Sequence, residues 1–332
     1  MERVYFYPPL KGKEYGNPYS ANYREALAKR YKLANIKGAP PIGMSIAFIL
    51  SVLRADIYVI NWLENIGYFR FGDIQFWFVR VGLWILKQRK SKIVWMFHNI
   101  HPHGGHNKYS KWLHEYMFKN ASLIISHSKE ATEYARKHTN IKVIYVCHPV
   151  HPIKMEHKNN EVAETDVFIW GSIVSYKGVY EFLQEEAKRN TGLRIRIIGK
   201  AEDKKLAESV SSLCKGDIVF ENRWGAFDEI EAYVRSCRYV LFPYVGSCVS
   251  SSGALIDTVV MGGTPVGPTV GAFKDLNEEG VCLTYTDYDD LFRMLKEEHA
   301  VTDKARKDFL QRNSWDNLVD VIYNNIHRSD LV

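Results

Sequence analysis

Short apolar segments alternate with helix-length segments along almost the whole chain, and this alternation restricts the possible folds more than any other feature. In the first half, apolar runs of strand length fall at residues 4–7, 57–60, 93–97, 123–126 and 143–146. In the second half they fall at residues 167–170, 193–198, 217–220, 239–243 and 264–267. Short, uniformly apolar runs are typical of strands buried on both faces, and the longer segments between them predict covering helices. We therefore expect an α/β protein with two Rossmann-like parallel sheets.

Length and composition favour two domains. A chain of 332 residues exceeds the usual size of a single core, and 46% apolar with 25% charged residues is typical of packed globular proteins. Residues 148–165 contain two prolines and a polar run, as expected of an exposed connection. We expect a first domain over residues 1–150 and a second over residues 165–325, with the terminal helix packing back on the first domain.

Several classes of protein are disfavoured. The five cysteines form no CxxC pair, which argues against a disulfide framework or a zinc ribbon. The net charge of +6 favours anionic partners such as phosphates, but it is too small to indicate nucleic acid. The start of the chain lacks the pattern of a secretion signal, and no segment reaches the roughly 20 apolar residues of a membrane span. We expect a cytoplasmic protein that binds no nucleic acid.

Two loops that follow strands carry residues suited to phosphate binding. After the run at 167–170 come Gly171, Ser172 and, five residues later, Lys177 at the start of a helical pattern. A glycine turn and a lysine beside a helix N-terminus suit a diphosphate, although an ordinary loop with a solvated lysine is the alternative. After the run at 239–243, a loop rich in hydroxyls leads into a helix. Its phosphate or sugar ligands would be Ser250, Ser251, Ser252 and Gly253, and a simple helix cap is the alternative.

The spacing Gly-x5-Lys-Gly at residues 171–178, with a later helix ending in Gly-Thr-Pro-Val at residues 263–266, resembles the retaining glycosyltransferases of family 4 and their GT-B relatives. The resemblance covers most of residues 165–325. It implies the GT-B fold, two Rossmann-like domains facing across a cleft, and a nucleotide-diphosphate sugar as donor. Because that sugar is a substrate, no cofactor and no essential metal are expected. By position, Lys177 would neutralise the diphosphate, while Arg223 and Trp224 would contact the nucleobase.

The chain also departs from the family 4 pattern. The family usually has two glutamates eight residues apart, and Ser250 and Thr258 occupy those positions here. Ser172 stands where an arginine is usual, and Asp257 is the candidate replacement for the ribose-binding carboxylate. The Ser-Ser-Gly-Ala form is similar to GT-B relatives that build bacterial exopolysaccharide, some of which invert stereochemistry, and we favour inversion. A sugar-nucleotide-binding protein without catalytic activity is the alternative.

The candidate catalytic residues lie in the first half. Four histidines fall within nine residues, from His98 to His106, directly after the strand at 93–97. Neutral imidazole suits hydrogen bonding and base catalysis near pH 7, so His98 and His103 are candidates for the general base. Glu64, after the strand at 57–60, is the third candidate. A metallohydrolase with the histidines as ligands is a further alternative, but HExxH is absent.

Two segments indicate the acceptor and a membrane. The loop after the first strand carries Lys11, Gly12 and Lys13, which are candidates to bind the acceptor, including a lipid diphosphate. Residues 69–92 combine aromatic and basic side chains typical of a membrane interface: Phe69, Phe71, Phe76, Trp77, Phe78, Trp84, Arg80, Lys87, Arg89, Lys90 and Lys92. The alternative is that half or more of these aromatic residues belong to the core. We therefore expect a peripheral enzyme of cell-surface polysaccharide synthesis, at the inner face of the plasma membrane, with a glycan or lipid-linked oligosaccharide acceptor.

Overall fold

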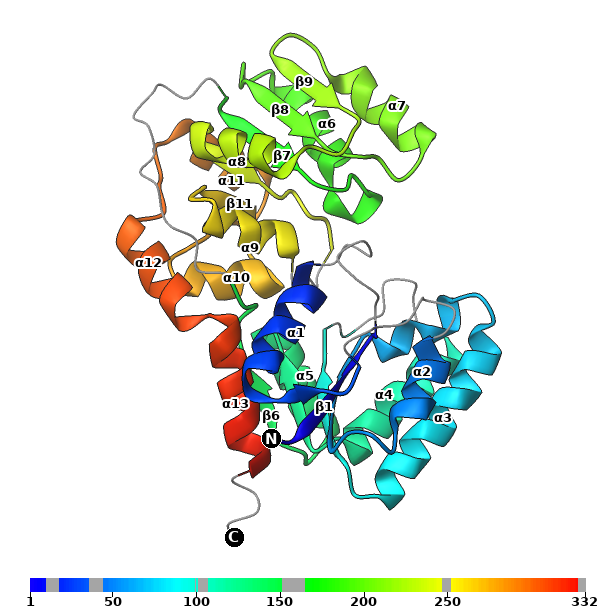
Figure 1. Ribbon diagram of the computed structural model, residues 1–332. Helices are drawn as coiled ribbons and strands as arrows, with labels where there is room; N and C mark the ends of the chain where they lie inside the picture. Colours follow the sequence, from blue (N-terminus) through cyan, green and yellow to red (C-terminus); the bar gives the residue numbers. More distant parts are fainter. Residues whose placement is uncertain are drawn as a thin grey trace. The chain divides into compact units, whose positions relative to one another are not determined.

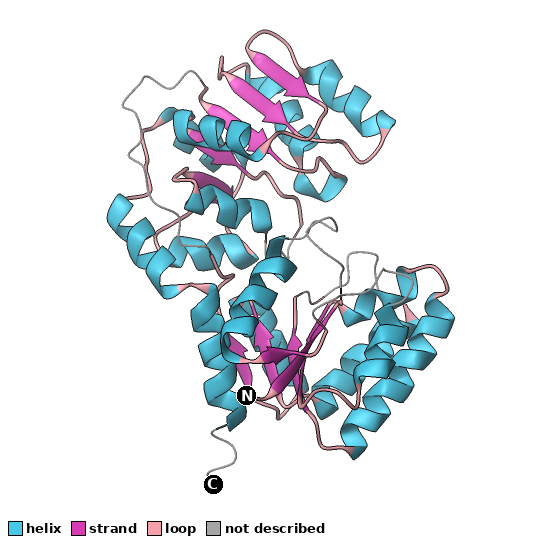
Figure 2. Ribbon diagram, viewed as in Figure 1, coloured by secondary structure: helices cyan, strands magenta, loops and turns pink. Residues whose placement is uncertain are grey.

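The chain divides into two compact units in a computed structural model that describes residues 1–9, 18–35, 44–98, 100, 107–150, 165–246 and 252–327. Unit 1 comprises Met1–Pro149 together with Asn313–Val332, and unit 2 comprises Val150–Arg312. Each unit contains its own parallel sheet covered by helices (Figures 1 and 2).

The described part of unit 1 contains a six-stranded parallel sheet in the order β2-β1-β3-β4-β5-β6. Its strands are β1 (Arg3–Tyr7), β2 (Lys32–Leu33), β3 (Ile57–Asn61), β4 (Lys92–Met96), β5 (Leu123–Ser126) and β6 (Val143–Tyr145). The central strands are apolar at most positions, and all five residues of β3, including Asn61 at its end, are buried. The strand order reverses between β1 and β3, where open α/β sheets bind ligands at their carboxyl ends.

The helices of unit 1 cover both faces of this sheet. They are α1 (Pro18–Arg30), α2 (Met44–Ser51), the 3₁₀ helix η3 (Leu63–Tyr68), α3 (Gly72–Gln88), α4 (Lys108–Asn120), α5 (Lys129–His138) and α13 (Trp315–His327). The last helix, α13, packs beside α1 although almost 300 residues separate them in sequence (Figure 1). Trp315 at its start is buried against Tyr19 and Tyr23, with ring centroids 4.9 and 5.6 Å away. The C-terminal helix thus completes the core of unit 1.

The described part of unit 2 contains a second six-stranded parallel sheet, in the order β12-β11-β10-β7-β8-β9. Its strands are β7 (Val167–Trp170), β8 (Ile195–Ile198), β9 (Ile218–Glu221), β10 (Tyr239–Leu241), β11 (Pro265–Pro268) and β12 (Leu283–Tyr285). Counted along the unit, this is the doubly wound 3-2-1-4-5-6 order of dinucleotide-binding folds. The reversal lies between β7 and β10, so the loops after these two strands leave the sheet in opposite directions.

Helices flank this sheet as well (Figure 2). They are the 3₁₀ helix η4 (Ser175–Lys177), α6 (Val179–Arg189), α7 (Lys204–Leu213), α8 (Phe227–Ser236), α9 (Gly253–Val260), α10 (Gly271–Glu278), α11 (Tyr288–Lys296) and α12 (Asp303–Arg312). The core of the unit gathers apolar side chains from the strands and from α6, α7 and α11.

The expected α/β class with two Rossmann-like sheets is confirmed. Each of the ten expected strands corresponds to an observed strand, with ends that differ by one or two residues. The sequence reading missed β2 and β12, because strands of two and three residues at sheet edges are too short to stand out from their surroundings.

Candidate functional site

The loops after β7 and β10 are held together by one glycine. Gly178 has a φ of 68°, in the left-handed region, and a Cβ built on it would lie 2.0 Å from the carbonyl oxygen of Pro243. No side chain fits there, so the position requires glycine. The N–H of Val245 also donates to the carbonyl of Tyr176 at 3.0 Å. These contacts tie residues 176–178 to residues 243–245 at the switch point of the sheet.

Lys177 occupies the centre of this arrangement. Its ammonium donates to the Ser172 hydroxyl at 2.9 Å and lies 5.8 Å from the ring centroid of Tyr244. Burial lowers the pKa of Lys177 to about 8. Among the described residues no carboxylate forms an ion pair with this ammonium. A largely buried cation without an anion is costly, and such groups gather at functional sites.

The N-terminus of α9 lies beside the same lysine. Gly171 connects the two, because a Cβ built on it would lie 3.6 Å from Lys177 Nζ and 4.0 Å from the Cβ of Ala254. Ser252 caps the helix: its hydroxyl accepts the N–H of Leu255 at 3.4 Å and is 3.2 Å from the Tyr244 hydroxyl. A Cβ on Gly253 would have no described residue within 4 Å. The first turn of α9 and the ammonium thus offer two positive groups to one anion.

Asp257 and Thr258, further along α9, differ in their environments. Burial raises the pKa of Asp257 to about 6. Thr258 is fully buried, and its hydroxyl accepts from Trp170 Nε1 at 3.0 Å while it donates to the carbonyl of Ala254 at 2.8 Å. Its hydroxyl is therefore used to join α9 to β7, a role that the sequence reading of Thr258 as a donor ligand did not include. The other candidates of this loop, Ser250 and Ser251, lie outside the described residues.

Arg223 and Trp224 follow β9, and both are exposed. Trp224 presents 66% of its surface to solvent, as a stacking face for a base would. The Arg223 guanidinium is held by the carboxylates of Glu221 and Glu229, which raise its pKa. The arginine is thus fixed in place by two acidic neighbours.

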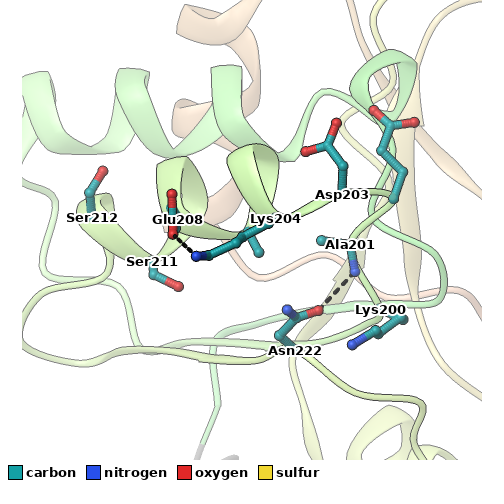
Figure 3. Close-up of a pocket in the computed structure, with 10 residues that line it drawn as sticks. Lys200, Ala201, Asp203, Lys204, Glu208, Ser211, Ser212 and Asn222 are labelled. Carbon is teal, nitrogen blue, oxygen red and sulfur yellow. Dashed lines mark hydrogen bonds and ion pairs between the residues drawn. The ribbon is translucent and has the colours of Figure 1, made fainter.

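A cavity of about 780 Å³ opens beside these residues (Figure 3). It is lined by Lys200, Ala201, Glu202, Asp203, Lys204, Ala207, Glu208, Ser211, Ser212 and Asn222. The side-chain oxygen of Asn222 accepts the N–H of Ala201 at 2.9 Å, and Lys204 faces Glu208 at 3.5 Å. Lys177 is not among the residues that line the cavity. Glu202 connects the cavity to the loop that carries Lys177, because its carboxylate accepts a hydrogen bond from the hydroxyl of Ser175 at 2.6 Å. The sequence reading did not identify this cavity, which depends on how α7 packs.

In unit 1, Asn61 sets the orientation of His98. The amide nitrogen of Asn61 donates to the carbonyl of Tyr7 at 3.0 Å, so its amide oxygen faces His98 Nε2, also at 3.0 Å. Since that oxygen can only accept, Nε2 carries the proton, and the acceptor of the neutral ring is Nδ1. The indole of Trp62 stacks on the imidazole of His98, with ring centroids 4.4 Å apart and an interplanar angle of 17°. The sequence reading identified His98 but missed Asn61 and Trp62.

His127 and His148 are further imidazoles close to His98. His127 Nδ1 donates to the carbonyl of Val146 at 2.8 Å, which leaves Nε2 to accept the hydroxyl of Tyr19 at 2.7 Å. Burial, and secondarily His148, lowers the pKa of His127 to about 3, and burial lowers that of His148 to about 4. Both rings are therefore uncharged near neutral pH.

Glu64 is a buried carboxyl in η3, directly after β3. It is 4% exposed, and burial raises its pKa to about 7. Its Oε2 atom has no hydrogen-bond partner among the described residues, and neither does the hydroxyl of Tyr7. The charge of Glu64 contributes to the raised pKa of Tyr7. A carboxyl that titrates near pH 7 is suited to accept or release a proton in a reaction.

Four other candidates from the sequence, Lys11, Gly12, Lys13 and His103, lie outside the described residues. Within the described part of the chain, no group of three His, Cys, Asp or Glu side chains is arranged to hold a metal ion.

Comparison of the sequence with protein-family models and with curated proteins gives no match. Solved structures of similar fold include HepE from Anabaena in complex with UDP-glucose, with a TM-score of 0.66, 11% identity and all of both chains covered. The lipopolysaccharide outer core galactosyltransferase WaaB has a TM-score of 0.63 and 13% identity, with 99% of this chain and 100% of that chain covered. A glycosyltransferase involved in avilamycin A biosynthesis has a TM-score of 0.61 and 14% identity, with 99% of this chain and 97% of that chain covered. The chain therefore has the GT-B fold, as the sequence resemblance implied.

Replacing Thr258 by valine should destabilise unit 2, because the indole N–H of Trp170 loses its acceptor. We expect a loss of about 1–3 kcal/mol in the free energy of unfolding, measured by urea titration. Ser211→Ala is the comparison, since it removes an exposed hydroxyl on α7 and should change the stability little. A Thr258→Val protein with unchanged stability would contradict the structural role of that hydroxyl.

Lowering the pH should destabilise unit 1 through its neutral histidines. A histidine with a depressed pKa stabilises the fold fully above its unfolded value of 6.5, and this stability is lost as the pH falls toward the folded value. At pH 5, about 1.5 units below 6.5, the expected loss is about 2 kcal/mol for each of His127 and His148. Urea unfolding at pH 7.5 and pH 5 measures the net change, in which protonation of Glu64, whose pKa is raised to about 7, offsets part of the loss from the histidines.

In that experiment His127→Gln should remove about 2 kcal/mol of the pH dependence, because the amide can make both hydrogen bonds without titrating. His138→Gln, on the exposed end of α5, is the matched control. An equal pH dependence in wild type and His127→Gln would contradict the assignment.

Proposed function

We propose that this chain is a glycosyltransferase that moves a sugar from a nucleotide-diphosphate donor to a glycan or lipid-linked oligosaccharide. The observation that carries the proposal is Lys177, a largely buried ammonium that pairs with no carboxylate among the described residues, beside the N-terminus of α9 and at the switch point of a doubly wound sheet. A diphosphate supplies the missing negative charge. HepE, which shares the fold, is described in complex with UDP and with UDP-glucose, which supports a nucleotide sugar as ligand.

The reaction requires a base and a stabilised leaving group. The acceptor hydroxyl oxygen bonds to the anomeric carbon of the donor sugar as the bond from that carbon to the diphosphate oxygen breaks. The hydroxyl proton passes to a base, for which His98 and Glu64 in unit 1 are the candidates. The nucleoside diphosphate leaves with its charge held by Lys177 and α9. In this scheme Asn61 is a positioning residue, because it acts only through His98.

The proposed transfer needs no cofactor and no essential metal. The charge that develops on the leaving diphosphate is met by the ammonium of Lys177 and by the backbone N–H groups at the start of α9, which supply the positive charge that a metal would otherwise provide. The prediction is that activity persists in EDTA.

We propose that the transfer inverts the configuration of the sugar. The hydroxyl of Thr258 occupies a position where family 4 has a glutamate, and it is fully buried and bonded to Trp170 and Ala254. No carboxylate is therefore available from that position, and a direct displacement by a base-activated acceptor does not require one.

The proposed place of action is the cytoplasm, at the inner face of the plasma membrane, in the synthesis of a cell-surface polysaccharide. WaaB, which shares the fold, is described as a lipopolysaccharide outer core galactosyltransferase. In the part of the chain that the structure describes, no helix is long and apolar enough to cross a bilayer.

Titration with UDP-, GDP- and dTDP-sugars, followed by thermal unfolding, tests the proposal. A ligand at one hundred times its dissociation constant adds about 2.7 kcal/mol to the stability of the folded state. We expect one nucleotide class to stabilise the wild type, Lys177→Gln to lose the stabilisation, and Lys177→Arg to retain part of it. Lys188→Gln, an exposed lysine on α6, is the matched control.

No stabilisation by any nucleotide sugar would contradict the proposed function. Stabilisation that survives in Lys177→Gln would move the diphosphate to another site. Binding of a nucleotide sugar with no release of nucleoside diphosphate in the presence of any acceptor would favour the non-catalytic alternative.

A further inference from the structure

Helix α3 is apolar on both of its sides. Its buried face includes Phe76, Val79 and Leu83, which pack into unit 1. The opposite face carries a second apolar stripe at helical spacing, exposed to solvent: Ile74, Trp77, Phe78, Val81 and Trp84. A surface helix normally presents polar groups on that side, and contiguous exposed apolar side chains mark interaction surfaces.

Phe76 is one of the aromatic residues of the set predicted from the sequence that belong to the core, because it is 7% exposed and its ring packs against Tyr109 and Trp112. The ammonium of Lys92, placed in the same set, donates to the carbonyl of Ile326 at 2.9 Å. Trp77 and Trp84 do belong to the exposed surface of α3, because each is 61% exposed.

Helix α2 extends the exposed surface. Its apolar stripe consists of Ile46 and Leu50, and Leu53, two residues after the end of the helix, continues it; these side chains are 46%, 64% and 71% exposed. The two helices pack directly against each other and lie side by side in Figure 1. Gly82 makes this possible, since a Cβ built on it would lie 2.7 Å from the ring of Phe48. We call the eight exposed side chains of the two stripes the α2–α3 face.

The charges around the α2–α3 face are almost all of one sign. Residues 70–92 contain six basic residues and one acidic residue, Asp73. The guanidinium of Arg80 lies over the rings of Trp77 and Trp112, at 4.8 and 5.0 Å. Lys87, Arg89 and Lys90 are exposed at the C-terminal end of α3. Apolar and aromatic side chains beside lysine and arginine match the interface of an anionic bilayer.

We propose that the α2–α3 face docks unit 1 onto an anionic phospholipid membrane. The apolar stripes enter the boundary between headgroups and acyl chains, with α3 lying in the membrane plane, while the basic side chains contact lipid phosphates. A second copy of the chain is the weaker candidate, because a two-fold interface would bring this basic segment against itself. The proposal adds a partner to the proposed function, which implies an acceptor held in a membrane, but vesicle binding does not itself depend on the donor site.

Flotation of the purified full chain with vesicles tests the docking. We expect the wild type to float with vesicles of phosphatidylcholine containing phosphatidylglycerol, and to float poorly with phosphatidylcholine alone or at high salt. Trp77→Gln/Trp84→Gln should reduce the bound fraction at least tenfold. Both side chains are largely exposed, so the fold should tolerate the change, which circular dichroism checks. Phe227→Gln, an exposed aromatic of unit 2, should bind as the wild type does.

The basic residues have a matched test. Lys87→Glu/Arg89→Glu should abolish the preference for anionic vesicles, whereas Lys304→Glu/Lys307→Glu on α12 changes the net charge equally and should retain it. Absence of flotation with anionic vesicles, or binding that the tryptophan pair does not alter, would overturn the proposal. A dimer that the tryptophan pair dissociates, measured by light scattering, would assign the face to a second copy instead. Thermal stabilisation by nucleotide sugars, measured on the same variants, tests the proposed function by itself. A failure of membrane docking can therefore be distinguished from a failure of the proposed function.

Discussion

The close approach of Gly178 to the carbonyl of Pro243 holds the site of unit 2 together. It ties the loop after β7 to the loop after β10, at the point where the strand order reverses. The turn that ends at Gly178 directs Lys177 back toward Gly171 and Ser172 and takes its ammonium out of water. Such an arrangement is unfavourable in the free protein, and it becomes favourable when an anion arrives. The folding of the loops thus prepares the site for a diphosphate before the ligand binds.

Unit 1 buries polar side chains whose pKa values are shifted toward the uncharged form. His127 and His148 have strongly depressed pKa values, while that of Glu64 is raised to about 7. Asn61 sets the tautomer of His98 through two hydrogen bonds, and the stacked indole of Trp62 limits the rotation of the ring. These groups lie at the carboxyl ends of the strands. Glu64, with a pKa near 7, can therefore accept a proton at neutral pH, as transfer to a hydroxyl group requires, whereas His127 and His148 are too weakly basic to do so.

The sequence predicts the sheets well because strands buried on both faces must be apolar at nearly every position. It also predicts the loop that carries Lys177, because the glycine, the lysine and the start of the helical pattern lie close together in sequence. It does not predict Asn61, because that amide acts through the register of β1 against β3. The role of Thr258 depends on Trp170, which is 88 residues away. The spacing of Ile46, Leu50 and Leu53 looks like an ordinary core-facing stripe, and only the packing of α2 on α3 shows that it faces outward.

The proton balance of donor binding tests the central role of Lys177 most directly. A bound diphosphate should raise the pKa of this lysine above its free value of about 8. Calorimetric titration with the active nucleotide sugar, in buffers of different ionisation enthalpy, counts the protons taken up. We expect roughly three quarters of a proton per ligand at pH 8.5, almost none at pH 6.5, and weaker binding as the pH rises through 8. Uptake that is absent at pH 8.5, or unchanged in Lys177→Gln, would show that the diphosphate does not bind at this ammonium.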